Sequence, residues 1–176
     1  MRPRLVTTHR GFTLLEAALV IIITGILAAT AIPALSSISA ARQASAADEL
    51  ERRLGVARAR AMAEGAPFGL AIDPAAQTLR TLTIASAGGT PTPATDPLGQ
   101  AEPVFNLAAA YPGVQITHVS TPAGSGAQTI WFAYDGAPHA RSAAGASLGT
   151  WSQDASITLT GGFTITIRGV TGAITR

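Results

Sequence analysis

Glu16 has the most unusual chemical setting in the sequence, because it is a carboxylate one turn inside the apolar stretch from Phe12 to Leu35. Placing an ionised carboxylate in hydrocarbon costs on the order of a few kcal/mol. A cation must therefore compensate the charge wherever lipid or other helices surround this segment. Ion pairing in an apolar environment is the chemistry that this position indicates.

Residues of the types that usually perform catalysis are poorly placed for it. The sequence has no cysteine, which excludes disulfides, thiolate metal sites and cysteine nucleophiles. His118 and His139 lack metal-ligand spacing, and residues 124–126, Gly-Ser-Gly, lack the frame of a nucleophile elbow. Asp135, followed by Gly136, fits a turn better than acid–base work. We expect a protein that is not an enzyme and that uses no metal and no cofactor.

The basic charge is concentrated at the N-terminus. The chain of 176 residues has a formal net charge of +2 and a pI near 9.9. Three of its twelve arginines lie within residues 1–11, so removing these residues leaves nine arginines against ten carboxylates. The basic pI is therefore no evidence for a nucleic-acid partner. Arg141, Arg168 and Arg176 are also too scattered to predict a nucleic-acid-binding patch.

Two general interpretations of the N-terminal segment leave Glu16 unexplained. A basic head before an apolar run fits a secretory signal peptide that is cut within residues 36–41. A permanent membrane anchor also fits, because residues 12–35 are 24 residues, enough to span about 30 Å of hydrocarbon. In that case the preceding arginines would hold the N-terminus in the cytoplasm.

A third interpretation accounts for the carboxylate. The stretch Gly11-Phe-Thr-Leu-Leu-Glu16 resembles the class III signal of type IV prepilins and type II secretion pseudopilins, and Gly25 and Pro33 also stand where that family places them. The resemblance implies that an inner-membrane prepilin peptidase cuts after Gly11 and that the new N-terminus, Phe12, is methylated. It further implies that Glu16 pairs with the N-terminal amine of a neighbouring subunit, which fixes the axial register of the two helices.

The helical pattern continues beyond this segment. Pro33 removes a backbone donor and predicts a kink, and with Gly25 it brackets a weak stretch. By resemblance to assembled pili, the residues between them unwind in the filament, with a kink alone as the alternative. Gly65 and Pro67 predict the end of the helix.

An apolar stripe and two ion pairs characterise the second half of this helix. The charged residues predict the pairs Asp48–Arg52 and Glu49–Arg53. Residues of the stripe recur at spacings of three and four, namely Ala47, Leu50, Leu54, Ala57 and Ala61.

After residue 65 the apolar period changes to two, which predicts strands. The expected strands are 68–72, 78–84, 114–120, 129–134, 156–160, 163–167 and a last short one within 170–175. Residues 85–103 and 137–154 read as loops, the second anchored by Trp151. Gly161 and Gly162 predict a hairpin at the end of the chain, with Ile157, Leu159, Phe163, Ile165 and Ile167 facing the core.

The predicted fold class is α+β and pilin-like, with a long N-terminal helix on a C-terminal antiparallel β-domain. The expected parts are a leader (1–11), a transmembrane and assembly half of the helix (12–35), an amphipathic half (36–64) and a periplasmic β-domain (65–176).

Two further passages resemble one branch of the family. Residues 57–67 and 132–136, Phe-Ala-Tyr-Asp-Gly, look like the corresponding parts of minor pseudopilins of the GspH and FimT type, and minor pilins of the MSHA type are the alternative. The chain departs from adhesive pilins in lacking cysteine, and from calcium-binding major pseudopilins in having an isolated Asp154.

The resemblance implies a structural subunit of a type II secretion pseudopilus or a type IV pilus. Its partners would be other subunits, the peptidase and methyltransferase, the inner-membrane assembly platform and, before assembly, lipid. The expected location is the bacterial inner membrane, with a single pass and a periplasmic C-terminal domain. The alternative is a secreted or anchored β-domain that acts as a binding module, including a minor pilin that binds DNA during uptake.

Overall fold

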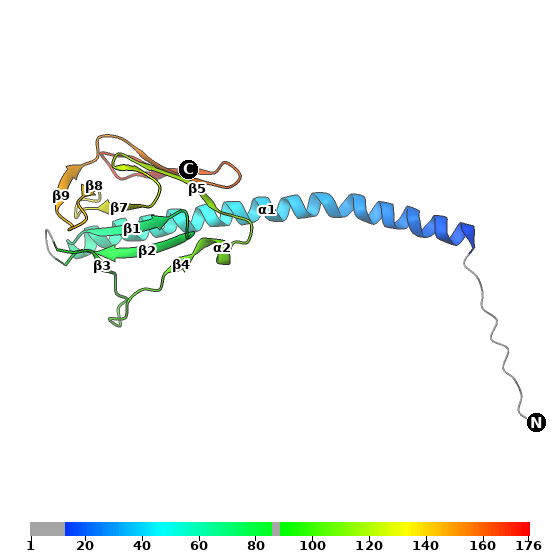
Figure 1. Cartoon of the computed structure of the whole chain (residues 1–176), viewed down its shortest axis with the longest axis horizontal. Coiled ribbons are helices and arrows are strands. Elements are labelled where there is room, and N and C mark those ends of the chain that lie inside the picture. Colours follow the sequence, from blue (N-terminus) through cyan, green and yellow to red (C-terminus); the bar gives the residue numbers. More distant parts are fainter. Residues whose placement is uncertain (1–12, 86–88) are drawn as a thin grey trace, which may run out of the picture. The chain divides into compact units, whose positions relative to one another are not determined.

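The computed structural model describes residues 13–85 and 89–176. The first helix, α1, spans Leu14–Glu64, and a boundary between two compact units falls between Ile38 and Ser39. Beyond that boundary, α1 runs beside β1 (Phe68–Asp73) and β2 (Thr78–Thr83) in the globular unit (Figure 1). Helix and antiparallel sheets together make an α+β fold, as the sequence predicts.

The apolar stripe in the second half of α1 lies in the core. Each of its members is at most 1% exposed, and they are Ala46, Ala47, Leu50, Leu54, Ala57 and Ala61. This confirms the predicted stripe and adds Ala46. Four of the six are alanines, so the stripe offers a narrow surface on which strand side chains can approach the helix closely. The helix ends at Glu64, and Gly65 follows with a φ of 64°.

The described strands form two antiparallel sheets. The larger sheet has the order β3-β2-β1-β7-β8-β9, with β4 also paired to β2. Its remaining strands are β3 (Thr92–Pro93), β4 (Phe105–Asn106), β7 (Gln128–Phe132), β8 (Pro138–Arg141) and β9 (Ser147–Thr150). Alternate residues of β1 and β7, including Phe68, Leu70, Ile130 and Phe132, are buried in the core.

The smaller sheet has the order β12-β11-β10-β5-β6. Its strands are β5 (Ile116–Thr121), β6 (Gly124–Ser125), β10 (Ala155–Leu159), β11 (Thr164–Ile167) and β12 (Ile174–Thr175). The hairpin of β10 and β11 is confirmed, with Ile157 paired to Ile165 and both glycines of the connection at positive φ. Of the five residues predicted to face the core, four are buried and Phe163 packs against them partly exposed.

The prediction of loops at 85–103 and 137–154 was wrong in part. Residues 137–154 contain β8 and β9, and residues 85–103 contain β3 and a bridge between Thr95 and Ala101. These strands carry no clear alternation, because β9 is exposed along its whole length and β3 has only two residues. Trp151 is 3% exposed, in agreement with its predicted anchoring role.

One of the two predicted ion pairs on α1 is wrong. Glu49 pairs with Arg53 at 2.7 Å, as predicted, and also with Arg52 at 2.8 Å. Asp48 pairs instead with Arg176, near the end of the chain. The hydrogen bonds from both arginines hold the pKa of Glu49 below its usual value against an opposing effect of burial, with Arg52 contributing most.

A short helix, α2 (Leu107–Ala110), joins the two sheets in sequence, and the Asn106 side chain caps it by accepting from the Ala109 N–H. It was not predicted.

Candidate assembly interface

The N-terminus of α1 is closed by a reciprocal cap between Thr13 and Glu16. The Thr13 hydroxyl accepts from the Glu16 N–H at 3.3 Å, and a Glu16 carboxylate oxygen accepts from the Thr13 N–H at 3.5 Å. This arrangement is a capping box, in which side chains satisfy two backbone donors that the helix leaves unpaired. Glu16 therefore has a local structural role besides the ion pairing that its setting predicts.

Large apolar side chains surround the first three turns of α1 and are exposed. Leu14 is 92% exposed, Leu15 81% and Ile21 72%. Further exposed members of this apolar sleeve are Leu19, Val20, Ile22, Ile23 and Ile26. Consecutive residues point to different sides of a helix, so this set leaves the helix no polar face. A helix with apolar side chains on every side is normally buried among other apolar groups.

The remaining residues predicted for this site are distributed as follows. Gly11 and Phe12 lie outside the described residues. Gly25 lies within α1, where an added Cβ would meet no other atom within 4 Å, and the bounds of α1 also include Pro33. The predicted weakness of the helix between Gly25 and Pro33 stays a prediction. Within the described part of the chain, Glu16 forms no ion pair.

Among the residues that the structure describes, no helix is both long enough and apolar enough to cross a bilayer.

In the globular unit, the two passages that resemble minor pseudopilins meet at Arg58. The Arg58 Nε donates to the Gly136 carbonyl at 3.0 Å, and its Nη2 donates to the Thr171 carbonyl at 3.0 Å. Arg58 thus connects α1 to the turn after β7 and to the turn between β11 and β12. Gly136 has a φ of 78°, and a Cβ there would lie 2.9 Å from the Met62 sulfur. The predicted Asp135-Gly136 turn is confirmed, since the Asp135 carboxylate accepts from the Ala137 N–H at 2.9 Å.

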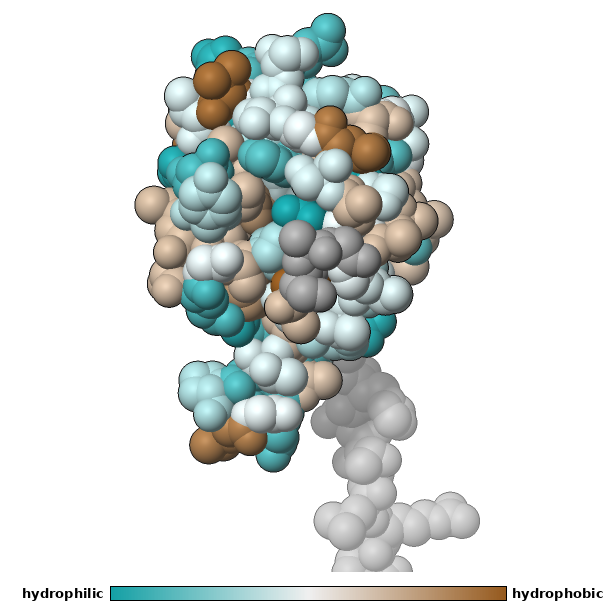
Figure 2. Space-filling view, turned by 90° about the vertical axis from the view of Figure 1, so that its left-hand side faces the viewer, coloured by the Kyte–Doolittle hydropathy of each residue, from teal (hydrophilic) through white to brown (hydrophobic). Residues whose placement is uncertain are grey.

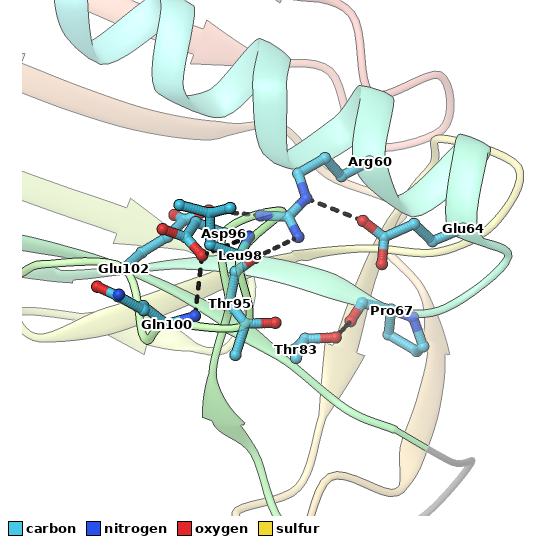
Figure 3. Close-up of polar contacts among 9 residues, drawn as sticks. All are labelled: Arg60, Glu64, Pro67, Thr83, Thr95, Asp96, Leu98, Gln100 and Glu102. Carbon is cyan, nitrogen blue, oxygen red and sulfur yellow. Dashed lines mark hydrogen bonds and ion pairs between the residues drawn. The ribbon is translucent and has the colours of Figure 1, made fainter.

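A second arginine of α1 holds the segment between β3 and β4. Arg60 donates to Glu64 at 3.0 Å, to Glu102 at 2.5 Å and to the Thr95 carbonyl at 3.0 Å (Figure 3). Its guanidinium also lies over the Phe68 ring, 4.4 Å from the ring centre. Arg58 and Arg60 therefore connect loops to the helix, although the sequence alone suggests only a solvated face.

The segment held by Arg60 has its own internal hydrogen bonds. One Asp96 carboxylate oxygen accepts from the Leu98 N–H at 2.9 Å and from the Gln100 N–H at 2.8 Å (Figure 3). Leu98 is 83% exposed. Figure 2 shows the hydrophobic residues on this end of the globular unit as separate patches, in contrast to the continuous apolar sleeve of α1.

Near the C-terminus, Asp154 holds the turn that follows β11. Its carboxylate accepts from the Gly169 N–H at 2.9 Å and pairs with Arg168 at 2.6 Å. The hydrogen bond from Gly169 and, to a lesser extent, the interaction with Arg168 lower the pKa of Asp154.

The two histidines that the structure describes, His118 and His139, lie apart from any such network of acids. His118 is exposed on β5, and His139 on β8 contacts the hydroxyls of Ser147 at 3.4 Å and Thr150 at 3.2 Å. Within the described residues, no group of three histidines or carboxylates is arranged to bind a metal.

Sequence reasoning missed Thr13, Arg58 and Arg60. A signal for Thr13 exists in the sequence, because threonine followed three residues later by glutamate, ahead of an apolar run, is the pattern of a capping box. The contacts of the two arginines with loops could not be assigned, because the partners in those loops are backbone carbonyls and a carboxylate 35 or more residues away.

Comparison with known proteins shows a likeness in structure. The chain matches no protein-family profile and no curated protein sequence at a significant level. Its structure is similar to that of the minor pseudopilin EpsH from the type 2 secretion system of Vibrio cholerae, with a TM-score of 0.53 and 13% sequence identity. The match covers 76% of this chain and 94% of the EpsH chain. The chain therefore has the fold of a minor pseudopilin.

Proposed function

We propose that this chain is a minor pilin or pseudopilin, a structural subunit of a type II secretion pseudopilus or a type IV pilus. The observation that carries the proposal is the apolar sleeve, which extends around α1 just beyond a carboxylate. Exposed apolar surface costs about 25 cal/mol per Å², so such a helix is stable only when it is covered. The pseudopilin fold supports the same conclusion.

In this proposal, two environments cover the apolar sleeve in turn. Before assembly, residues 12–35 lie in the inner membrane, with the N-terminus in the cytoplasm and the β-domain in the periplasm. After the peptidase has cut behind Gly11 and Phe12 has been methylated, the assembly platform moves the subunit into the filament. Helices of neighbouring pilin or pseudopilin subunits then replace the lipid.

Glu16 has two separable roles in this scheme. Its carboxylate accepts from the Thr13 N–H and so begins the helix. In the filament the same carboxylate pairs with the N-terminal amine of a neighbouring subunit, because either charge alone would be strongly unfavourable between apolar helices. The capping role tolerates glutamine, which can also complete a capping box, whereas the pairing role requires a negative charge.

Three substitutions in the full-length chain separate these roles. Glu16→Gln keeps the capping box and removes the charge, Thr13→Ala removes the cap and keeps the charge, and Glu16→Ala removes both. We expect both Glu16 variants to be cleaved normally and to lower the amount of the subunit in sheared, purified filaments at least tenfold. Thr13→Ala is expected to lower it only slightly.

Normal incorporation of Glu16→Gln would contradict the pairing role and leave the cap as the function of this residue. Loss of incorporation in Thr13→Ala that equals the loss in Glu16→Gln would contradict it too. Immunoblots of the filament and membrane fractions measure both the cleavage of the subunit and its incorporation into filaments on the same sample.

A further inference from the structure

Two buried nitrogen donors of the globular unit have no hydrogen-bond partner within the described residues. They are Nε of Arg141, on β8, and the indole nitrogen of Trp151, which directly follows β9. Buried polar atoms are nearly always paired, so each exception calls for an explanation. Both atoms carry a hydrogen, and the group that would satisfy them is therefore an acceptor.

Both residues line the same cavity, which has a volume of about 420 Å³. Both tryptophans of the chain, Trp131 and Trp151, contribute to its wall, together with small residues such as Ala123 and Ala143. Trp131 lies beside Gly69 on the neighbouring strand, where a Cβ would come within 2.7 Å of its ring. The glycine therefore leaves room for the indole on this face of the sheet.

A second hollow shares part of its wall with this cavity. Residues Ala127, Gln128 and Thr129 line both, and the second hollow extends to Asp73 at the end of β1 and to Arg80 within β2. Together the two hollows form a groove, which we call the β7 groove, over β1, β2 and β7. An elongated groove with small wall residues suits an extended peptide. The backbone of such a peptide is narrow, and its successive side chains point to opposite sides.

The charges of the unit indicate what such a peptide carries. Nine arginines and nine carboxylates lie after residue 38, so the unit has no net charge. Within the described residues, Arg141 forms no ion pair, and its Nη1 donates to the Gly145 carbonyl at 2.7 Å. It is also half-buried, and burial lowers its pKa.

A partly desolvated guanidinium without a carboxylate is unfavourable until an anion reaches it. The planar guanidinium of arginine matches the two oxygens of a carboxylate in geometry and charge. A nucleic acid would require a cluster of cations, whereas the arginines among the described residues that line the β7 groove are Arg80 and Arg141. The observations therefore favour one carboxylate on a peptide over a polyanion.

We propose that the β7 groove binds an extended peptide segment of a partner protein and that Arg141 receives an aspartate or glutamate side chain of that segment. The site stands on residues of the globular unit alone and does not depend on how the apolar sleeve is used.

The two tryptophans give a direct test, because the chain has no others and both line the groove. The full-length protein in detergent micelles is titrated with the blocked peptide acetyl-Ala-Ala-Asp-Ala-Ala-amide, and the indole and arginine Nε–H resonances are followed by NMR. We expect saturable shifts of both indole signals and of one arginine signal. The matched peptide with asparagine in place of aspartate is expected to bind about tenfold more weakly, since hydrogen bonds to a charged group are stronger than those between neutral groups.

Two variants identify the arginine. Arg141→Gln should remove the difference between the aspartate and asparagine peptides, and Arg168→Gln, which changes an exposed arginine outside the groove, should preserve it. Equal binding of the two peptides to the unmodified protein, or no shift with either, would overturn the proposal without any variant. Shifts of the indole signals with a single-stranded oligonucleotide but not with the aspartate peptide would overturn it in favour of a nucleic-acid site.

Discussion

Replacing Gln77 by alanine should destabilise the globular unit by more than its position in a hairpin turn suggests. The Gln77 side chain donates from Nε2 to the Ile116 carbonyl at 3.0 Å, and its Oε1 accepts from the Ile116 N–H at 2.7 Å. The side-chain amide thus pairs with the start of β5 as a neighbouring strand would. It connects the β1–β2 turn of the larger sheet to the smaller sheet.

The magnitude follows from what alanine leaves behind. Ile116 is 3% exposed, so its N–H and carbonyl would both lose their partner in a region that water reaches poorly. Each lost bond costs about 1–2 kcal/mol under these conditions, which gives about 2–4 kcal/mol for the pair. For a unit of this size, that loss corresponds to a fall in Tm of about 8–15 °C.

Glycine at the same position is the matched control. Gln77 has a φ of 55°, a conformation that costs a residue with a Cβ about 1 kcal/mol and costs glycine almost nothing. Gln77→Gly should therefore be about 1 kcal/mol more stable than Gln77→Ala and still clearly less stable than the unmodified chain. Thermal unfolding of the full-length protein in detergent, followed by tryptophan fluorescence, measures all three. A Tm of Gln77→Ala within about 2 °C of the unmodified value would refute the role assigned to the amide.

Two further substitutions test the turns that fasten the unit together. Gly136→Ala should lower the stability of the unit by about 2–3 kcal/mol, because it combines a positive φ with a Cβ only 2.9 Å from the Met62 sulfur. Gly99→Ala is the control, since Gly99 has a similar φ and open space around it. It should lower the stability by about 1 kcal/mol in the same melting experiment. The lowered pKa of Asp154 means that its contribution to stability is complete above the ordinary pKa of aspartate and is lost as the pH falls through the lowered value. Unfolding scans between pH 6 and pH 3, at about one-unit steps, should therefore show a smaller fall in Tm for Asp154→Asn than for the unmodified chain, and parallel curves would exclude a role for this carboxylate.

The sequence predicts the parts of the fold in which a local pattern is strong. The stripe that includes Leu50 and Leu54 follows from helical spacing, and the hairpin around Gly161 and Gly162 follows from strict alternation beside a glycine pair. In both cases the residues that decide the structure are neighbours in the chain or one helical turn apart.

The parts that could not be predicted depend on contacts between distant segments. β9 has four exposed residues and no alternation, so only its pairing with β8 makes it a strand. Asp48 pairs with Arg176, 128 positions away, instead of with the nearby Arg52. The sequence predicts a scattered surface charge at Arg141, whereas the residue is half-buried. Burial of a β8 side chain depends on segments that the local sequence does not identify.

The residues of the candidate site also fall into those that a local sequence pattern reveals and those that only the folded chain reveals. Glu16 stands out in the sequence because a charge in an apolar run is visible without a structure. Its capping partner Thr13 also has a local signal, because it stands three positions before a glutamate and ahead of an apolar run. The contacts of Arg58 with two turns required the folded chain.

Mass spectrometry of the N-terminal peptide of the mature protein, purified from the cells that produce it, tests the central claim most directly. We predict that the mature chain begins at Phe12 and carries one methyl group on its amine. A chain that begins beyond Ser36 would contradict it, because the apolar sleeve and Glu16 would then be absent from the finished protein.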